Sequence, residues 1–226
     1  MEQRQAERAR SDLQADLARA DRILGLPEVQ AALQAVEEAE RDRVFCRHGF
    51  GHLMDVARAA WILTLEEGRD LPKDLVYASA LLHDLGRADQ YRDGTPHDLA
   101  GADLARRLLP RAGFSEEETE AAVLAIRGHR RKTTEDDVRL PASETVGSSK
   151  DAGPSKIVGT PETAGPTNNV GATETGGGPE AEPGPLSRDL SSVLRRADKL
   201  TRPCLRCPAS ADCHWPEEKK NRALTL

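Results

Sequence analysis

Two histidines four residues apart, His48 and His52, lie in the stretch CRHGFGHLMDVARAA at residues 46–60, just before an apolar run. On a helix, residues at this spacing share one face, one turn apart. A single histidine beside apolar residues is usually a hydrogen-bonded packing residue. The pair therefore indicates chemistry only if other histidines or acids join it.

Two acidic residues fall on predicted helices that are otherwise apolar. Asp84 directly follows His83 at the end of KDLVYASALLHDLG, the most apolar predicted helix of the chain. Asp198, in RRADKL, lies on the edge of the apolar face of the last predicted helix. A buried, unpaired carboxylate is costly, and a bound cation removes that cost. Because imidazole and carboxylate together suit iron, manganese or zinc, these residues indicate a transition-metal site.

The chain has four cysteines, and their spacing makes them a second group of candidate ligands. Cys204, Cys207 and Cys213 follow the pattern C-x2-C-x5-C, and Cys46 is the fourth. Three thiols at this density call for one more ligand, as in a four-cysteine site for zinc or an iron–sulfur cluster. Unligated thiols, or His214 in place of one cysteine, are the alternatives.

Helix geometry indicates that Cys46 can reach the other cysteines. Cys46 precedes His52 by six residues and Cys204 follows Asp198 by six. Each interval corresponds to about 9 Å of helix, at roughly 1.5 Å per residue. If His52 and Asp198 bind the same metal, both cysteines lie close to that metal, and all four thiols can converge.

The elements that must position these residues are all predicted to be helices. Apolar residues recur at helical spacing, and no segment alternates with period two for long enough to predict a strand. Ser115 and Glu118 form a capping box at the start of one helix. The predicted helices cover residues 13–24, 27–36, 48–65, 73–85, 97–109, 116–129 and 188–200. The expected fold class is all-α.

Residues 132–186 differ in composition from the rest of the chain. They are rich in Gly, Pro, Thr, Ser and Glu and contain almost no large apolar residue. Such a segment buries too little surface to offset the entropy of ordering it. We therefore expect a disordered low-complexity insertion between residues 1–131 and residues 187–226, where Ser187 caps the last core helix ahead of a cysteine-rich segment.

Three pieces of the sequence, HLMDVARAA, ALLHDLGR and RADKL, resemble the H…HD…D signature of the HD superfamily of metal-dependent phosphohydrolases. They supply, in this order on predicted helices, His52, His83, Asp84 and Asp198. The resemblance covers roughly residues 40–131 and 187–202. It implies an HD-domain helical bundle with the insertion before its last core helix.

The resemblance also implies a second metal ion. His97, in GTPHDLAGADLA, and His129, in AIRGHRR, fall where the two-metal branch of the superfamily has further ligands. Asp84 then takes the role of the carboxylate that bridges both ions. Two such ions of iron, manganese or zinc activate a water and clamp the phosphoryl oxygens.

The end of the chain resembles two groups of HD proteins. The two-metal HD enzymes that hydrolyse bis-nucleosyl tetraphosphates have a similar ADK ending, but LTRPCLRCPASADCHW departs from them. The cysteines of this tail are similar to those of small bacterial HD-domain proteins that end in ADK followed by three cysteines and a tryptophan. The substrate of the tetraphosphate enzymes therefore does not transfer directly to this chain.

Candidate catalytic residues follow the expected ligands closely. Arg58, Arg87 and Lys199 carry positive charge that can stabilise a phosphoryl transition state, although a solvated helix face is the alternative for each arginine. His48 could bind the substrate phosphate, donate a proton or orient His52. We expect the substrate or proton role for His48.

Composition narrows the class of partner. The formal net charge of −6 argues against stable nucleic-acid binding, which needs a basic face. No run approaches eighteen apolar residues and the start MEQRQAERAR lacks the apolar core of a signal peptide, so we expect a cytoplasmic protein that does not enter membranes. In that reducing compartment the cysteines are not expected to form disulfides.

Three functions follow from these patterns. The favoured one is a metal-dependent phosphohydrolase acting on a nucleotide or another small phosphate ester. An HD-fold di-iron oxygenase uses similar ligands, and iron content with oxygen consumption would distinguish it. A non-catalytic redox or nucleotide sensor with a four-cysteine metal site is the third. A pure binding module need not keep His52, His83, Asp84 and Asp198 together, which argues against the sensor.

Overall fold

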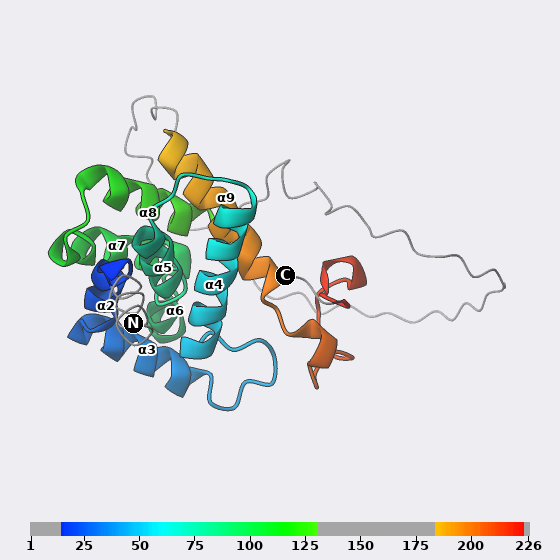
Figure 1. Ribbon diagram of the computed structural model, residues 1–226. Coiled ribbons are helices and arrows are strands. Elements are labelled where there is room, and N and C mark those ends of the chain that lie inside the picture. Colours follow the sequence, from blue (N-terminus) through cyan, green and yellow to red (C-terminus); the bar gives the residue numbers. More distant parts are fainter. Residues whose placement is uncertain (1–14, 131–183, 224–226) are drawn as a thin grey trace, which may run out of the picture. The chain divides into compact units, whose positions relative to one another are not determined.

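The computed structural model describes residues 15–130 and 184–223, and within these ranges its regular structure is helical, without strands (Figure 1). The all-α prediction is confirmed. The α-helices are α2 (Ala18–Leu24), α3 (Pro27–Ala39), α4 (Phe50–Glu66), α5 (Lys73–Leu82), α6 (Arg87–Asp93), α7 (His97–Leu108), α8 (Glu116–Gly128) and α9 (Pro185–Leu200). Short 3-10 turns are η1 (Pro110–Ala112), η3 (Cys204–Arg206) and η4 (Glu217–Lys219). None of the described helices is long and apolar enough to cross a lipid bilayer.

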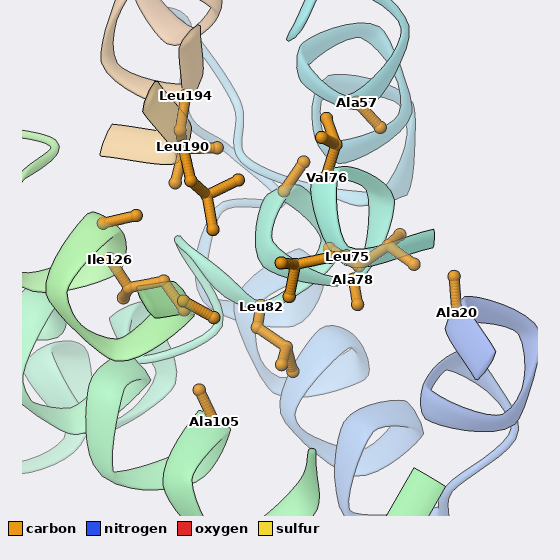
Figure 2. Close-up of a cluster of buried hydrophobic side chains, with 14 of the residues drawn as sticks. Ala20, Ala57, Leu75, Val76, Ala78, Leu82, Ala105, Ile126, Leu190 and Leu194 are labelled. Atoms are coloured by element: carbon orange, nitrogen blue, oxygen red, sulfur yellow. The ribbon is translucent and has the colours of Figure 1, made fainter. Parts of the chain in front are cut away.

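Helix α5 is the centre of the core and contacts α2, α4, α7, α8 and α9. After its first turn the sequence of α5 is largely apolar on every side, as a surrounded helix requires. Leu75, Val76 and Leu82 are completely buried, and Figure 2 shows them among side chains from the neighbouring helices. Each such side chain contributes about 1.5–3 kcal/mol through burial. This packing fixes the end of α5, where His83 follows.

Helix α9 packs its apolar face against α4 and α8. Leu190 and Leu194 on that face lie near Ile126 of α8 in Figure 2. The prediction that Ser187 caps this helix is wrong, because α9 begins at Pro185 after Gly184. Proline fits the first helical position, where its fixed φ is suitable and its missing N–H is not needed.

The predicted insertion therefore ends earlier than residue 186, since Pro185 and Leu186 belong to α9. Residues 132–183 of the predicted insertion lie outside the described residues, as does Leu13 of the first predicted helix. The capping box of α8 is confirmed. Ser115 Oγ accepts a hydrogen bond from the Glu118 backbone N–H at 3.2 Å, and Glu118 Oε2 accepts one from the Ser115 N–H at 2.8 Å.

The end of α5 and the start of α7 approach each other closely at two glycines. A Cβ on Gly86 would lie 2.1 Å from the backbone oxygen of His97 and 2.5 Å from the nitrogen of Gly101. A Cβ on Gly101 would lie 3.3 Å from the backbone oxygens of Leu82 and His83. Only glycine permits the first contact, and the approach brings His97 beside the residues that follow α5.

Candidate metal centre

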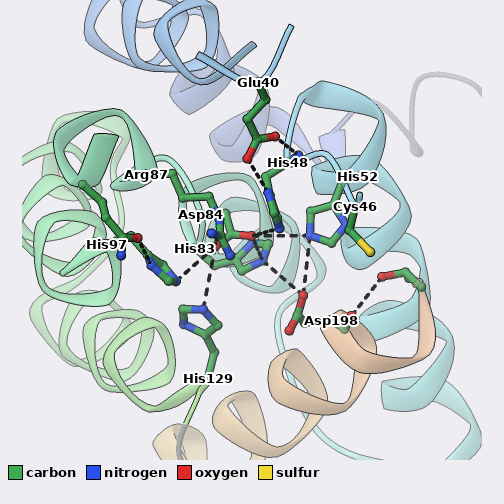
Figure 3. Close-up of polar contacts among 12 residues, drawn as sticks. Glu40, Cys46, His48, His52, His83, Asp84, Arg87, His97, His129 and Asp198 are labelled. Atoms are coloured by element: carbon green, nitrogen blue, oxygen red, sulfur yellow. Dashed lines mark hydrogen bonds and ion pairs between the residues drawn. The ribbon is translucent and has the colours of Figure 1, made fainter. Parts of the chain in front are cut away.

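Six histidine and aspartate side chains from five helices or their ends point toward one another in Figure 3. They are His52 in the first turn of α4, His83 and Asp84 after α5, His97 at the start of α7, His129 after α8 and Asp198 near the end of α9. Asp84 is 1% exposed and lies at the centre of the group. The structure thus brings together all six residues that the sequence indicated as metal ligands.

The first group of ligand atoms comes from His52, His83, Asp84 and Asp198, all within 4.8 Å of one another. Asp84 Oδ2 lies 3.5 Å from His52 Nε2 and 3.3 Å from His83 Nε2. Asp198 Oδ1 lies 3.5 Å from His52 Nε2 and 3.9 Å from His83 Nε2. Atoms that bind one ion at about 2.0–2.2 Å are separated by roughly 3–4 Å, so these distances suit a shared metal.

The second group uses the other oxygen of Asp84. Asp84 Oδ1 lies 3.4 Å from His97 Nε2 and 3.8 Å from His129 Nε2, and the three residues form a compact ligand group. Asp84 therefore offers one oxygen to each group. This arrangement suits two neighbouring ions that share a bridging carboxylate.

Hydrogen bonds on the far side of three rings fix which nitrogen is available. The Nδ1 of His83 lies 2.7 Å from the Ala80 carbonyl oxygen, and the Nδ1 of His129 lies 2.5 Å from that of Ile126. The Nδ1 of His97 lies 2.6 Å from Gln90 Oε1. Because these oxygens only accept, each Nδ1 carries a proton, and each Nε2 is the nitrogen that faces the centre and presents a lone pair there when the ring is neutral.

The atoms at the centre lack other partners. The Nε2 atoms of His52, His83 and His97 and both oxygens of Asp84 are buried and have no hydrogen-bond partner in the described part of the chain. Buried polar atoms are almost always hydrogen-bonded, so such a cluster needs a specific explanation. Carboxylate oxygens and the free nitrogens of neutral imidazoles are lone-pair donors, so a metal ion would satisfy them, and the residues fit the expected metals. Arg87 Nε, 2.9 Å from Asp84 Oδ1, also faces this carboxylate.

Burial and charge act differently on the histidines of the two groups. In the second group burial lowers the pKa of His97 to about 4, and the charge of Arg87 acts in the same direction. Burial also lowers the pKa of His129. In the first group burial alone would lower the pKa of His83, but Asp84 and Asp198 outweigh it and raise the pKa to about 10. The two carboxylates thus create a strong demand for positive charge, which a metal can meet.

The profile of the HD domain family matches residues 49–202, a range that contains both groups of ligands. The chain belongs to this family. HD domains bind divalent metal ions, and the two ligand groups of this HD domain are where such ions can be held.

Individual relatives match this HD protein to different extents. It is 29% identical over 189 residues to an uncharacterized protein of Clostridium beijerinckii, which covers 84% of this chain and 87% of that protein. The bifunctional uridylyltransferase/uridylyl-removing enzyme of Rhodospirillum rubrum is 43% identical over 54 residues, which is 24% of this chain and 5% of the enzyme. A predicted HD superfamily hydrolase from an uncultured Thermotogales bacterium has 31% sequence identity and a TM-score of 0.37, covering 47% of this chain and 60% of that chain.

His48 borders the metal centre of the HD domain without joining either ligand group. Its Nε2 lies 4.0 Å from Asp84 Oδ2, and its ring lies 5.3 Å from that of His52, centroid to centroid. The sequence predicted a helix from residue 48, but α4 begins at Phe50, so His48 lies in the preceding loop. Gly49 takes the extended N-cap position there, which ends the helical path before it reaches His48.

A buried carboxylate forms hydrogen bonds to His48 on the side away from the metal-ligand groups. Glu40, 2% exposed at the end of α3, lies 2.6 Å from His48 Nδ1 and accepts a hydrogen bond of 2.6 Å from the His48 backbone N–H. The hydroxyl of Tyr91 in α6 also donates to Glu40. Burial would raise the pKa of Glu40, but the hydrogen bonds from His48 and Tyr91 outweigh it and lower the pKa to about 2. Glu40 is therefore ionised, and His48 Nδ1 is the donor.

Sequence reasoning missed Glu40, Tyr91 and Gln90. The only local signal was an acid at the end of an amphipathic helix, which is common on solvated helix faces. Its partners are 8 and 51 residues away along the chain, so no spacing rule connects them.

The expected cationic residues are in different surroundings. Arg87 Nε lies 2.9 Å from Asp84 Oδ1, so the guanidinium faces the carboxylate that both ligand groups share. Arg58 is not brought into the site, because it lies on the exposed face of α4 with its Nη1 3.6 Å from Asp55 Oδ1. This matches the solvated-face alternative for Arg58. Lys199 is half-buried directly after Asp198.

The four cysteines are free thiols and do not form a third ligand group of this compactness among the described residues. Cys46 lies in the loop before α4, and Cys204 begins η3 after α9 has ended at Leu200. The two intervals predicted as helix are therefore wrong, since neither is continuous helix.

Proposed function

We propose that this HD protein is a two-metal phosphohydrolase that acts on a nucleotide or another small phosphate ester. The observation that supports this most is the carboxylate of Asp84, whose two oxygens each face a separate group of ligand atoms. Divalent iron, manganese or zinc ions bound there would supply an activated water and neutralise charge on the phosphoryl oxygens.

Arg87 has a positioning role in this proposal. Its ion pair with Asp84 Oδ1 restrains the carboxylate that both ligand groups share. A bridging carboxylate that rotated would lose the alignment of at least one oxygen. The positive charge beside it also favours the ionised form of Asp84, which is the form that can bind metal.

His48 is assigned the transfer of a proton to or from the substrate. The Glu40 carboxylate accepts from Nδ1, which leaves Nε2 as the ring atom that faces the centre. A group hydrogen-bonded in this way keeps its orientation while Nε2 exchanges a proton with a leaving oxygen. Glu40 acts through His48 and does not itself reach the substrate, so it is a positioning residue.

A pocket beside the centre provides space for a small substrate. Its volume is about 380 Å³, within the usual range for small-molecule sites. The lining residues are Glu37, Glu40, Arg47, Gly49, Phe50, Gly51 and His52. Phe50 is 40% exposed, and an exposed aromatic side chain in such a lining would be able to stack on a nucleobase. The pocket thus offers room for a small ligand next to His52.

Metal analysis of anaerobically purified protein, followed by assays of nucleotides and phosphomonoesters with Mn(II) or Fe(II), tests the proposal. We expect phosphate release that depends on added metal and is lost in His83→Ala. Oxygen consumption by iron-loaded protein without phosphate release would instead support the di-iron oxygenase. Tight nucleotide binding without either reaction would support the sensor.

A further inference from the structure

The segment after α9, residues 201–223, has little apolar burial to hold it in place. Its regular structure consists of the short turns η3 and η4. Only Cys204 and Ala209 in this segment are buried. Small units with so little core are usually fixed by disulfides or a structural metal.

Polar contacts nevertheless fold this segment back on the end of α9. The side-chain nitrogen of Asn221 donates to the carbonyl oxygens of Lys199 and Leu200 at 2.9 Å each, and to that of Arg202 at 3.1 Å. The guanidinium of Arg202 lies 4.4 Å from the centre of the Trp215 ring. These contacts satisfy the last carbonyls of α9 and set the path of the chain through the cysteines.

The same segment meets the loop in front of α4. The ring of Phe45 lies 6.5 Å from that of His214, in an edge-to-face arrangement. Burial raises the pKa of the neighbouring Cys46 thiol, and the charges of Cys204 and Cys207, with a smaller effect of Cys213, raise it further. Phe45 and His214 directly adjoin Cys46 and Cys213 in the chain, so their ring contact brings the loop of Cys46 beside the cysteine segment.

We propose that Cys46, Cys204, Cys207 and Cys213 form a four-cysteine site that binds either a zinc ion or an iron–sulfur cluster. Four thiolates, two of them in a C-x2-C pair, are the ligand set that both prefer. No three of the described sulfur atoms reach the 4.8 Å spacing of the histidine and aspartate ligands. Binding therefore draws the segment of Cys204, Cys207 and Cys213 closer to Cys46.

Such a site would connect two parts of the HD domain that supply the metal centre. Cys46 precedes His48 by two residues, and Cys204 follows Asp198 by six. The cysteine site thus anchors the loop of His48 to the segment that follows Asp198. It does not depend on the proposed phosphohydrolase activity, because its ligands and its test are separate.

Cobalt(II) titration of the metal-stripped, reduced full-length chain tests the site. Thiolate-to-cobalt charge-transfer absorption should saturate at the intensity of one cobalt ion bound by four thiolates, while the four thiols lose their reactivity toward a disulfide reagent. Cobalt at the histidine centre gives no such absorption. For an iron–sulfur cluster, protein purified anaerobically should instead contain acid-labile sulfide and visible absorption.

The variants Cys46→Ser and Cys207→Ser should each lose the charge-transfer or cluster signal, whereas Asp212→Asn, an exposed change in the same segment, should retain it. Retention of the full signal in either cysteine variant would overturn the four-cysteine site. If a variant fails to fold, the measurements on the wild-type chain alone test the site. Thiols that stay reactive with saturating cobalt, in protein without labile sulfide, would also overturn it.

Discussion

The metal centre and the segment of residues 201–223 hold their candidate ligands in opposite ways. Asp84, His83, His97 and His129 are buried at helix ends whose positions are fixed by the apolar core around α5. Most of the C-terminal segment is exposed or half-buried. Cys204 begins the short turn η3, Cys207 follows it, and Cys213 lies outside regular structure. Packing therefore preforms the first group of side chains, whereas we expect the proposed cysteine site to gain order from its ligand. We expect metal to serve chemistry in one and structure in the other.

The largest effect should follow from removing the shared carboxylate. In Asp84→Ala both ligand groups lose their common oxygens, so phosphate release should fall to background and metal content should drop at both groups. Circular dichroism should still show a helical protein, because the core around α5 is unchanged. Asp55→Ala, an exposed change in α4, is the control and should behave as wild type. Wild-type turnover in Asp84→Ala would contradict the assignment of the centre.

The packing that preforms the centre can be tested at Gly86. In Gly86→Ala the added Cβ meets the His97 backbone oxygen at 2.1 Å, so α7 must shift away from the end of α5. Urea denaturation should show a loss of about 1–3 kcal/mol in unfolding free energy, as for other overpacked sites. Metal content should fall as His97 moves. Gly128→Ala, where a Cβ meets nothing within 4 Å, is the matched control. Equal stability of the two variants would show that the close approach is not required.

The Glu40–His48 pair should affect turnover more than metal binding. In Glu40→Gln the ionised acceptor of His48 Nδ1 is lost, and we expect activity to fall about 10- to 100-fold with metal content unchanged. Steady-state assays and metal analysis measure the two effects, with the exposed Glu38→Gln as control. Loss of metal in Glu40→Gln would mean that His48 is a ligand.

The same variant should change the pH dependence of stability. The pKa of Glu40 falls from 4.5 to about 2 on folding, so its carboxylate stabilises the native state above 4.5. That contribution is lost as pH falls toward 2. The difference in unfolding free energy between wild type and Glu40→Gln should therefore be largest above pH 4.5 and shrink in acid. A constant difference would contradict the low pKa.

Loss of a cysteine should loosen the C-terminal segment without changing the stability of the helical core. In Cys207→Ser we expect faster proteolytic cleavage within residues 201–223, while the unfolding free energy of the helical core changes by no more than about 0.5 kcal/mol. Limited proteolysis with mass spectrometry and urea denaturation measure the two regions separately. Asp212→Asn should match wild type in both. Equal proteolysis of all three proteins would show that packing alone orders the segment.

The smallest effect should come from shortening the predicted insertion. Replacing residues 138–183 by a short Gly/Ser linker should preserve helicity and metal content. Loop-closure entropy changes by only about 0.6 kcal/mol for each doubling of loop length. Circular dichroism and metal analysis check this, and a loss of either would show that the segment is structural.

Much of the helical plan was predictable because its signals are local. The capping box of Ser115 and Glu118 and the apolar face of Leu190 and Leu194 repeat within one or two helical turns. Helix starts were less predictable. Ser187 is a good capping residue by type, but Gly184 and Pro185 begin α9 one turn earlier. Competing start signals a few residues apart cannot be ranked from sequence alone.

By itself, the sequence determined which residues have the chemistry for a metal centre. Histidine and aspartate on apolar helices need partners whatever the fold, so His52, His83, Asp84 and Asp198 could be named from their types and settings. Only the tertiary structure decided how they are used. The division of the Asp84 oxygens between two groups, and the hold of Glu40 and Tyr91 on His48, depend on where separate helix ends meet. Periodicity within one helix does not predict which helix ends come together, because long-range packing determines this.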